Sequence, residues 1–215
     1  MSLRTLNLSM YKPEIYRKEE NPYIRRFIAA HPFATFVTTD KSMIATHIPV
    51  LITDAKKREF TLFSHIAKHN EQVQHLSDNS EALVIFQGAH GYVSSSWYAE
   101  DDISTWDYSA VHVNAAIRLQ TEAELRSSLE ALVHHFEKNQ KQPKEFRDLP
   151  KELIDSHVSR IIGFYLIPTR VQSIAKYHQG FDQKDISSIA RHLSERNGPM
   201  DPQLIQNIQD ENRSY

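Results

Sequence analysis

The hydrophobic pattern of the first half of the chain has the period of β-strands. Short segments rich in β-branched and aromatic residues follow one another from residue 34, and polar turns at 40–42 and 54–58 separate them. From Val111 to Leu119 apolar residues alternate with polar ones, which predicts one buried face and one polar face. The expected strands are Ala34–Thr39, Met43–Ile52, Glu59–Ser64, Ala82–Gln87, Gly91–Ser95, Ser109–Leu119 and Ile161–Pro168.

Helical signals stand before, between and after these strands. Asn21-Pro22 predicts a helix start, and a short polar helix is expected at about 69–76. Thr121 and Glu124 form a capping-box pattern that begins a helix with an apolar stripe. Asp182 begins another helix, which Gly198-Pro199 should end, and a short one follows from Asp201.

This order predicts a mainly β fold with added helices, of the α+β class. The first six of these strands are short and have few helices between them, which favours an antiparallel barrel, because closure leaves no exposed edge. We expect a single domain over residues 10–215. Its barrel core should cover about 33–120 and 160–175, and its main helices 121–139 and 182–208.

Composition removes several classes of function. The 215 residues include no cysteine, which excludes disulfides and thiolate chemistry, and five glycines that form neither a dinucleotide fingerprint nor a P-loop. The start at Met1 lacks a secretory signal, and no apolar run reaches the roughly 20 residues that span a bilayer. Cytoplasmic localisation without membrane association is therefore expected. The net charge of −2 does not favour direct DNA binding, and the basic cluster at 56–58 is typical of a solvated loop.

The segment from Phe86 to Val113 is the densest in aromatic and polar residues. It contains both tryptophans, Trp97 and Trp106, together with serine, glutamine and histidine side chains. A planar cofactor that forms hydrogen bonds needs such a mixture of rings and polar groups. A hairpin with aromatic cross-strand pairs explains the same pattern, so the composition leaves both interpretations open.

Several spaced blocks resemble the PaiB family of FMN-binding negative transcriptional regulators. Residues 86–98 read FQGAHGYVSSSWY, residues 105–108 read TWDY, and residues 111–113 read VHV. Further matches are MYKP at 10–13, TT at 38–39, ATHIP at 45–49 and HIAKHN at 65–70. The resemblance is close from about residue 10 to 113 and looser beyond.

This resemblance implies a split β-barrel related to pyridoxamine-phosphate oxidases. It also implies a homodimer that holds FMN in the groove between its subunits. By position, Thr38, Thr39 and His47 would lie along the isoalloxazine ring, and His65, Lys68 and Asn70 near the phosphate. The remaining pocket residues would be Gln87, Ser94, Ser95, Ser96, Trp97 and Trp106.

The sequence departs from the family pattern at several positions. Where the family has Pro-Thr-Trp-Asn-Tyr, the fourth residue here is Asp107. The family's Lys-x-Ser-Gln-Asn stretch keeps Lys176 and Gln179 but has His178 in place of the serine. A carboxylate at 107 that faced the flavin would oppose the anionic reduced ring and lower its potential.

Other chemistry stays open beside the flavin. An FMN-dependent oxidoreductase acting on a small molecule is the alternative to a regulator, since no general acid or base stands out. Haem is a second cofactor candidate, because several histidines could provide an axial ligand. A zinc site at His65 and His69, and a catalytic triad drawn from Ser95, His112 and Asp107, are weaker alternatives. The haem candidates are His47, His65, His90 and His112.

Overall fold

The computed structural model describes residues 10–40, 42–53 and 59–213, so the basic cluster at 56–58 and the start at Met1 lie outside the described residues. The chain forms two compact units. We name residues 25–86 and 112–171 the barrel unit, and residues 10–24, 87–111 and 172–213 the ribbon unit. Strands β7 (Thr105–Leu119) and β8 (Ile161–Lys176) each run from one unit into the other.

The sheet of the barrel unit is antiparallel and curls back on itself. Its strand order is β2-β1-β5-β7-β8-β4-β3. The first and last strands of this order are joined by Val50 alone, so a flat sheet could not connect them and the ends must come together. The predicted split-barrel fold is thereby confirmed. The strands are β1 (Phe33–Thr39), β2 (Met43–Pro49), β3 (Leu51–Ile52), β4 (Leu62–Ala67) and β5 (Glu81–Gln87).

Alternation along the strands fills the barrel. In β1, Ala34, Phe36 and Thr38 are buried while their neighbours are partly or fully exposed. Phe36 stacks on Phe164 of β8 with ring centroids 5.0 Å apart. The same two-residue period buries Val113, Ala115 and Ile117 in β7, as the sequence predicted.

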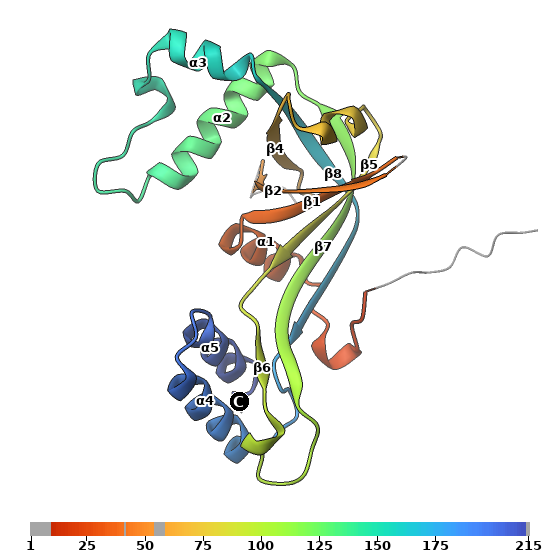
Figure 1. Cartoon of the computed structure of the whole chain (residues 1–215), viewed down its shortest axis with the longest axis vertical. Helices are drawn as coiled ribbons and strands as arrows, with labels where there is room; N and C mark the ends of the chain where they lie inside the picture. Colours follow the sequence, from red (N-terminus) through yellow and green to blue (C-terminus); the bar gives the residue numbers. More distant parts are fainter. Residues whose placement is uncertain (1–9, 41, 54–58, 214–215) are drawn as a thin grey trace, which may run out of the picture. The chain divides into compact units, whose positions relative to one another are not determined.

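Three α-helices and two short 3₁₀ segments accompany this sheet. Helix α2 (Glu122–Glu137) begins with the predicted capping box between Thr121 and Glu124. It lies beside α3 (Lys151–Val158) (Figure 1). Arg126 joins the two helices by an ion pair of 2.7 Å to Asp155. The short 3₁₀ segments η2 (Glu71–His75) and η4 (Phe146–Asp148) precede β5 and α3. Helix α1 (Asn21–Ala30) buries Ile24, Phe27 and Ile28.

Some predicted boundaries are wrong. The strand expected at Glu59–Ser64 forms at Leu62–Ala67, where antiparallel pairing with β8 sets its position. The helix expected from residue 69 starts at Glu71, because Asn70 is its N-cap. It is a 3₁₀ segment. Helix α3 was not predicted, because its eight residues are too few for a clear helical period. The strands expected to end at residues 95 and 168 end at Val93 and Lys176.

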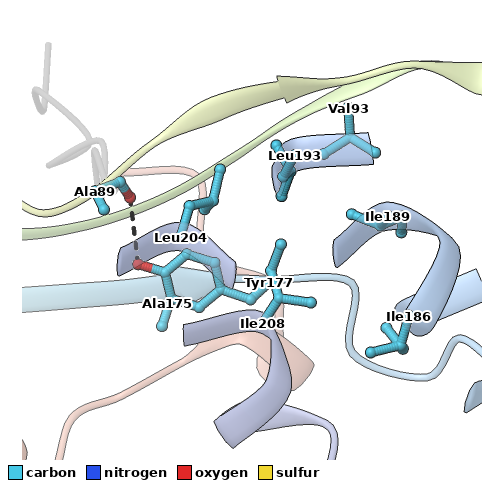
Figure 2. Packing of buried hydrophobic residues seen from close by; sticks show 9 residues of the cluster. All are labelled: Ala89, Val93, Ala175, Tyr177, Ile186, Ile189, Leu193, Leu204 and Ile208. Atoms are coloured by element: carbon cyan, nitrogen blue, oxygen red, sulfur yellow. Dashed lines mark hydrogen bonds between the residues drawn. The ribbon is translucent and has the colours of Figure 1, made fainter. Parts of the chain in front are cut away.

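The ribbon unit packs two helices on a narrow sheet. Strand β6 (Gly91–Val93) pairs with β7, and the short segments η1 (Glu14–Tyr16) and η3 (Ser95–Trp97) flank the unit's core. Helices α4 (Gln183–Arg196) and α5 (Asp201–Glu211) lie side by side and contribute most of its apolar side chains (Figure 2). The core residues are Ala89, Val93, Ala175, Tyr177, Ile186, Ile189, Leu193, Leu204 and Ile208.

The turn between α4 and α5 is fixed by charge and backbone geometry. Helix α4 begins at the predicted cap Asp182 but ends at Asn197, which adopts the left-handed conformation with φ 52°, one residue before the predicted glycine. Arg196 donates to both carboxylate oxygens of Asp201, at 2.9 and 2.5 Å. A side chain at Gly91 would meet Leu204 at 2.7 Å, so β6 needs glycine to lie this close to α5.

No helix within the described ranges is long and apolar enough to cross a membrane.

Truncating the core of the ribbon unit should destabilise it strongly. Leu204 is fully buried between α4 and β6. We expect Leu204→Ala to lower the free energy of unfolding by about 2–5 kcal/mol, because it removes apolar burial and leaves a cavity. Gln209→Ala, at an exposed position of the same helix, should change it by less than about 0.5 kcal/mol. Urea denaturation followed by circular dichroism measures both; equal effects would contradict this packing.

Candidate functional site

Thr38 belongs to a buried polar network at one end of β1. Its hydroxyl lies 3.0 Å from Gln72 Nε2 and 3.1 Å from His75 Nδ1. Gln72 is fully buried, and its amide also donates to the carbonyls of Phe36 and Ile44. Its Oε1 has no partner among the described residues. The network attaches η2 to strands β1 and β2.

Asn70 extends this network towards β2. Its side-chain oxygen accepts from Gln72 N at 2.9 Å and caps η2, while its Nδ2 donates to Thr46 Oγ1 at 3.1 Å. The structure therefore brings two predicted site residues, Thr38 and Asn70, together through Gln72.

Thr39 and His47 lie on the opposite, exposed face of β1 and β2. In the strand register His47 pairs with Thr35 and Thr39 with Met43, which places all four side chains on one face. His47 also stacks on Phe33, with centroids 6.2 Å apart. Thr38 and Thr39 thus point to different sides, so only Thr39 shares a face with His47.

His65 and Lys68 line two neighbouring cavities next to α2 and α3. His65 faces an apolar cavity of about 270 Å³, which His157 also lines, and burial lowers the pKa of its imidazole. Lys68 lines a larger cavity of about 570 Å³ together with Arg126 and Lys151. Arg126 and Lys151 pair with carboxylates, whereas Lys68 donates to the carbonyl of Ser159 at 2.7 Å. Within the described ranges, no carboxylate pairs with Lys68.

The predicted residues of the ribbon unit form two groups. Trp106 of β7 is half exposed, lies opposite Tyr92 of β6, and donates from Nε1 to His90 Nδ1 at 3.2 Å. Trp97 stacks on His192 of α4, with ring centroids 5.1 Å apart, and packs against the apolar core of the ribbon unit. Ser94 caps η3, Ser95 and Ser96 lie within it, and Gln87 is exposed at the end of β5.

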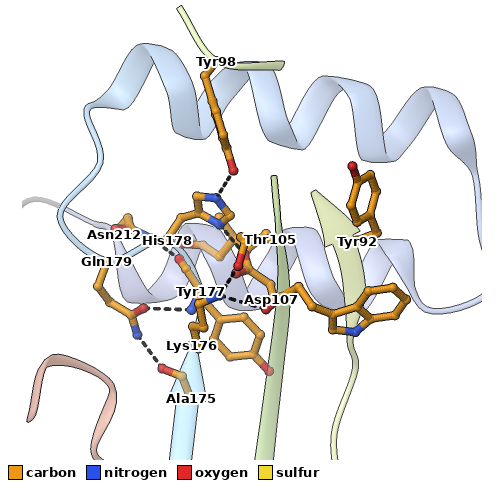
Figure 3. A network of polar contacts seen from close by, with 12 residues as sticks. Tyr92, Tyr98, Thr105, Asp107, Ala175, Lys176, Tyr177, His178, Gln179 and Asn212 are labelled. Atoms are coloured by element: carbon orange, nitrogen blue, oxygen red, sulfur yellow. Dashed lines mark hydrogen bonds and ion pairs between the residues drawn. The ribbon is translucent and has the colours of Figure 1, made fainter. Parts of the chain in front are cut away.

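Asp107 does not present its carboxylate to the surface. It is fully buried, and its Oδ2 lies 2.5 Å from His178 Nδ1, while His178 Nε2 lies 2.8 Å from the Tyr98 hydroxyl (Figure 3). Burial raises the pKa of the Asp107 carboxyl. The sequence alone gave no reason to connect Asp107 with His178, because 71 positions separate them.

These positions also bear on the alternatives to a flavin. Asp107 contacts the imidazole of His178, not that of His112. The structure therefore does not form the catalytic triad considered for Ser95, His112 and Asp107. No group of three or more metal-ligating side chains is found within the described part of the chain.

Comparisons with known proteins identify the family. Residues 10–170 match the family model described as "Putative FMN-binding domain". The chain belongs to this family. FMN is its main cofactor, and the predicted PaiB resemblance is confirmed. The chain is 29% identical over 202 residues to "Protease synthase and sporulation protein PAI 2" of Bacillus subtilis, covering 94% of this chain and 97% of that protein.

Solved structures share the fold at low sequence identity. The FAD and haem binding protein from Mycobacterium smegmatis has a TM-score of 0.56 and 13% identity, over 80% of each chain. The flavocytochrome Anf3 from Azotobacter vinelandii has a TM-score of 0.56 and 10% identity, over 80% of this chain and 75% of that one. These similarities support the split-barrel architecture.

The residues of the barrel unit fit FMN chemically. A flavin needs a flat surface with hydrogen-bonding groups at its edge, which the β1–β2 face offers through His47 and Thr39. A phosphate needs a cation that is not already neutralised, and among the described residues Lys68 forms a hydrogen bond to a carbonyl and no ion pair.

Removing the buried amide of η2 should cost stability. Gln72→Met keeps the volume but leaves the Thr38 hydroxyl and two carbonyls without their donor. We expect a loss of about 1–3 kcal/mol in the free energy of unfolding. Gln74→Met, exposed in the same segment, is the control and should have little effect. A stability of Gln72→Met equal to that of the control in thermal and urea denaturation would refute the role of this network.

Proposed function

We propose that this protein is a homodimeric FMN-binding regulator of PaiB type, whose regulatory role depends on its flavin rather than on tight DNA binding. The family match over residues 10–170 is the observation that carries the proposal. We further propose that residues 10–215 act as one domain, because β7 and β8 are each continuous through both units. We propose the cytoplasm as its location.

The exposed face of β1 and β2 supports a dimer. Phe33 is 67% exposed and Met43 77% exposed, and both lie on the face that carries His47. Val37 of β1 and its cross-strand partner Leu83 of β5 extend this face, and both are half buried. Apolar side chains gathered on one sheet face favour association with a second copy.

FMN would lie against this face, between the copies. His47 and Thr39 would contact its ring and Lys68 its phosphate, with Asn70 holding η2 beside β2. In the ribbon unit, the exposed Trp106 and the polar residues from Gln87 to Ser96 stay candidate cofactor contacts through the family resemblance. When bound, FMN supplies hydride and electron transfer, and the protein supplies binding and orientation.

The alternatives predict different spectra and activities. His65 and His157 line one apolar cavity and could provide axial ligands to haem. A protein that binds haem there would show a Soret band upon purification. A flavin-dependent oxidoreductase would oxidise NAD(P)H with a small-molecule acceptor. A flavin spectrum without either property supports the regulator.

Two substitutions on the same face should separate FMN binding from dimerisation. His47→Ala should weaken FMN binding at least tenfold, about 1.4 kcal/mol, yet preserve the dimer. Met43→Glu should weaken both, because it places a charge in the apolar contact and the cofactor lies between the copies. Flavin fluorescence titration and analytical ultracentrifugation measure the two effects.

Matched controls lie away from this face. His134→Ala changes an exposed histidine of α2, and Met200→Glu an exposed methionine of the ribbon unit. Both variants should bind FMN and dimerise as the unmodified chain does. A Met43→Glu protein that remains dimeric would place the interface elsewhere.

DNA affinity tests the regulatory part of the proposal. With a net charge of −2, the FMN-loaded protein should bind DNA from its own upstream region no more tightly than about 10⁻⁶ M at physiological salt. Gel shifts with oxidised and reduced protein, beside unrelated DNA, measure this. Sequence-specific binding near 10⁻⁸ M would instead indicate a direct operator-binding repressor.

A further inference from the structure

The ribbon unit contains a cavity that the flavin proposal does not use. Its volume is about 180 Å³, and a cavity of about 150 Å³ accommodates benzene. Aromatic and aliphatic walls come from Tyr16, Tyr98, Ile103 and Phe181. The remaining lining residues are polar: Asp102, Thr105, Asp107, Lys176 and His178. The cavity therefore suits a single aromatic ring that carries a polar group.

Three of these residues form a chain of hydrogen bonds from the cavity into the interior. Tyr98 is half buried, His178 is 3% exposed and Asp107 is fully buried. The distances are 2.8 Å from the Tyr98 hydroxyl to His178 Nε2 and 2.5 Å from His178 Nδ1 to Asp107 Oδ2. Figure 3 shows the imidazole between the other two side chains.

The direction of these bonds follows from the chemistry of the groups. An ionised carboxylate can only accept, so His178 Nδ1 donates to Asp107. In a neutral imidazole the other nitrogen is then an acceptor, and the Tyr98 hydroxyl donates to it. The oxygen of Tyr98 keeps lone pairs that can accept a proton from a ligand. This is the order of groups that passes a proton from a hydroxyl to histidine in hydrolytic triads.

The arrangement carries two structural costs. His178 has a positive φ of 58°, which is unfavourable for a residue with a side chain. Asp107 Oδ1 is buried and has no partner among the described residues. Strain and unsatisfied buried groups of this kind concentrate at functional sites.

Burial and nearby charges act on the two groups that flank His178. Burial raises the pKa of Asp107, which makes its carboxylate a stronger base towards the imidazole. Burial and nearby carboxylates raise the pKa of Tyr98 to about 12, so its hydroxyl stays protonated until a ligand supplies another proton. Five titratable groups face the hydrogen-bonded series of Tyr98, His178 and Asp107. They are Tyr16 of η1, Tyr92 of β6, Asp102, Lys176 of β8 and Asp185 of α4.

Lys176 provides a cation at the same cavity. Its ammonium group donates to Thr105 Oγ1, and to the Trp106 carbonyl at 3.1 Å. An ammonium has three donors, and the described residues accept from two of them, which leaves the third for an oxygen anion of the ligand.

We propose that this cavity binds a small phenol and that Tyr98, His178 and Asp107 take up its proton. The phenol gives its proton to the Tyr98 oxygen as Tyr98 gives its own proton to His178 Nε2. The imidazolium is held by Asp107, and the phenolate lies beside Lys176. The reverse transfer protonates a bound phenolate. Asp107 and His178, two of the positions that depart from the family pattern, are the two ends of one hydrogen bond.

The test uses 4-fluorophenol and the FMN-loaded full chain. Fluorine NMR, recorded across pH, reports both binding and ionisation of the probe. We expect saturable binding and ionisation of the bound phenol at least one pH unit below the free phenol, a tenfold change in the ionisation ratio. The ether 4-fluoroanisole has the same ring without the proton, and its signal should not depend on pH.

Variants distinguish proton transfer through Tyr98, His178 and Asp107 from a purely structural role of these residues. Tyr98→Phe and Asp107→Asn should each abolish the shift in ionisation while circular dichroism stays unchanged. The double variant Asp107→Asn/His178→Ser restores the family residues at both positions and should fold but lose the shift. Tyr11→Phe, an exposed tyrosine outside the cavity lining, should keep it.

Several outcomes would overturn the proposal. These are the absence of saturable binding, a bound probe that ionises as the free phenol does, or a shift that persists in both Tyr98→Phe and Asp107→Asn. Flavin loading is measured separately on each sample, so failure of the phenol site is distinguishable from failure of FMN binding.

Discussion

The closure of the sheet through Val50 is the constraint from which the barrel unit follows. Because β2 and β3 lie at opposite ends of the strand order but are consecutive in the chain, the sheet can only exist as a curled surface. Curling gives each strand an inner side, which Phe36 and Phe164 fill, and an outer side, which carries His47 and Thr39. The inner side holds the fold together, and the outer side remains available to a cofactor and a second copy.

Buried polar groups give each unit a definite arrangement. In the barrel unit, Gln72 donates to two carbonyls and a hydroxyl, which fixes η2 against β1 and β2. In the ribbon unit, the buried Asp107 holds His178 in place. A buried group without its partner is costly, so such networks specify one packing more strictly than apolar contacts do. Both networks include an oxygen with no partner among the described residues.

The two networks suggest different roles in one protein. That of the barrel unit supports the strands that we propose to contact FMN. That of the ribbon unit contains a carboxylate, an imidazole and a phenol in sequence beside a cavity, which is suited to moving a proton. A flavoprotein with a separate proton-handling site could respond to a small molecule as well as to the redox state of its cofactor.

The sequence by itself determined most of the elements and the family. The two-residue period of β7, the capping box at Thr121 and the cap at Asp182 are local signals, and local chemistry realises them in the structure. The spaced motifs were sufficient to indicate the split barrel and FMN, because each preserves residue types at fixed spacing. Only the tertiary structure decided which side chains meet. It placed Thr38 inside and Thr39 outside, gave Asn70 its role as a cap, and paired Asp107 with His178 across 71 positions. Such contacts depend on strand register and packing between distant segments, and a linear pattern carries no information on either.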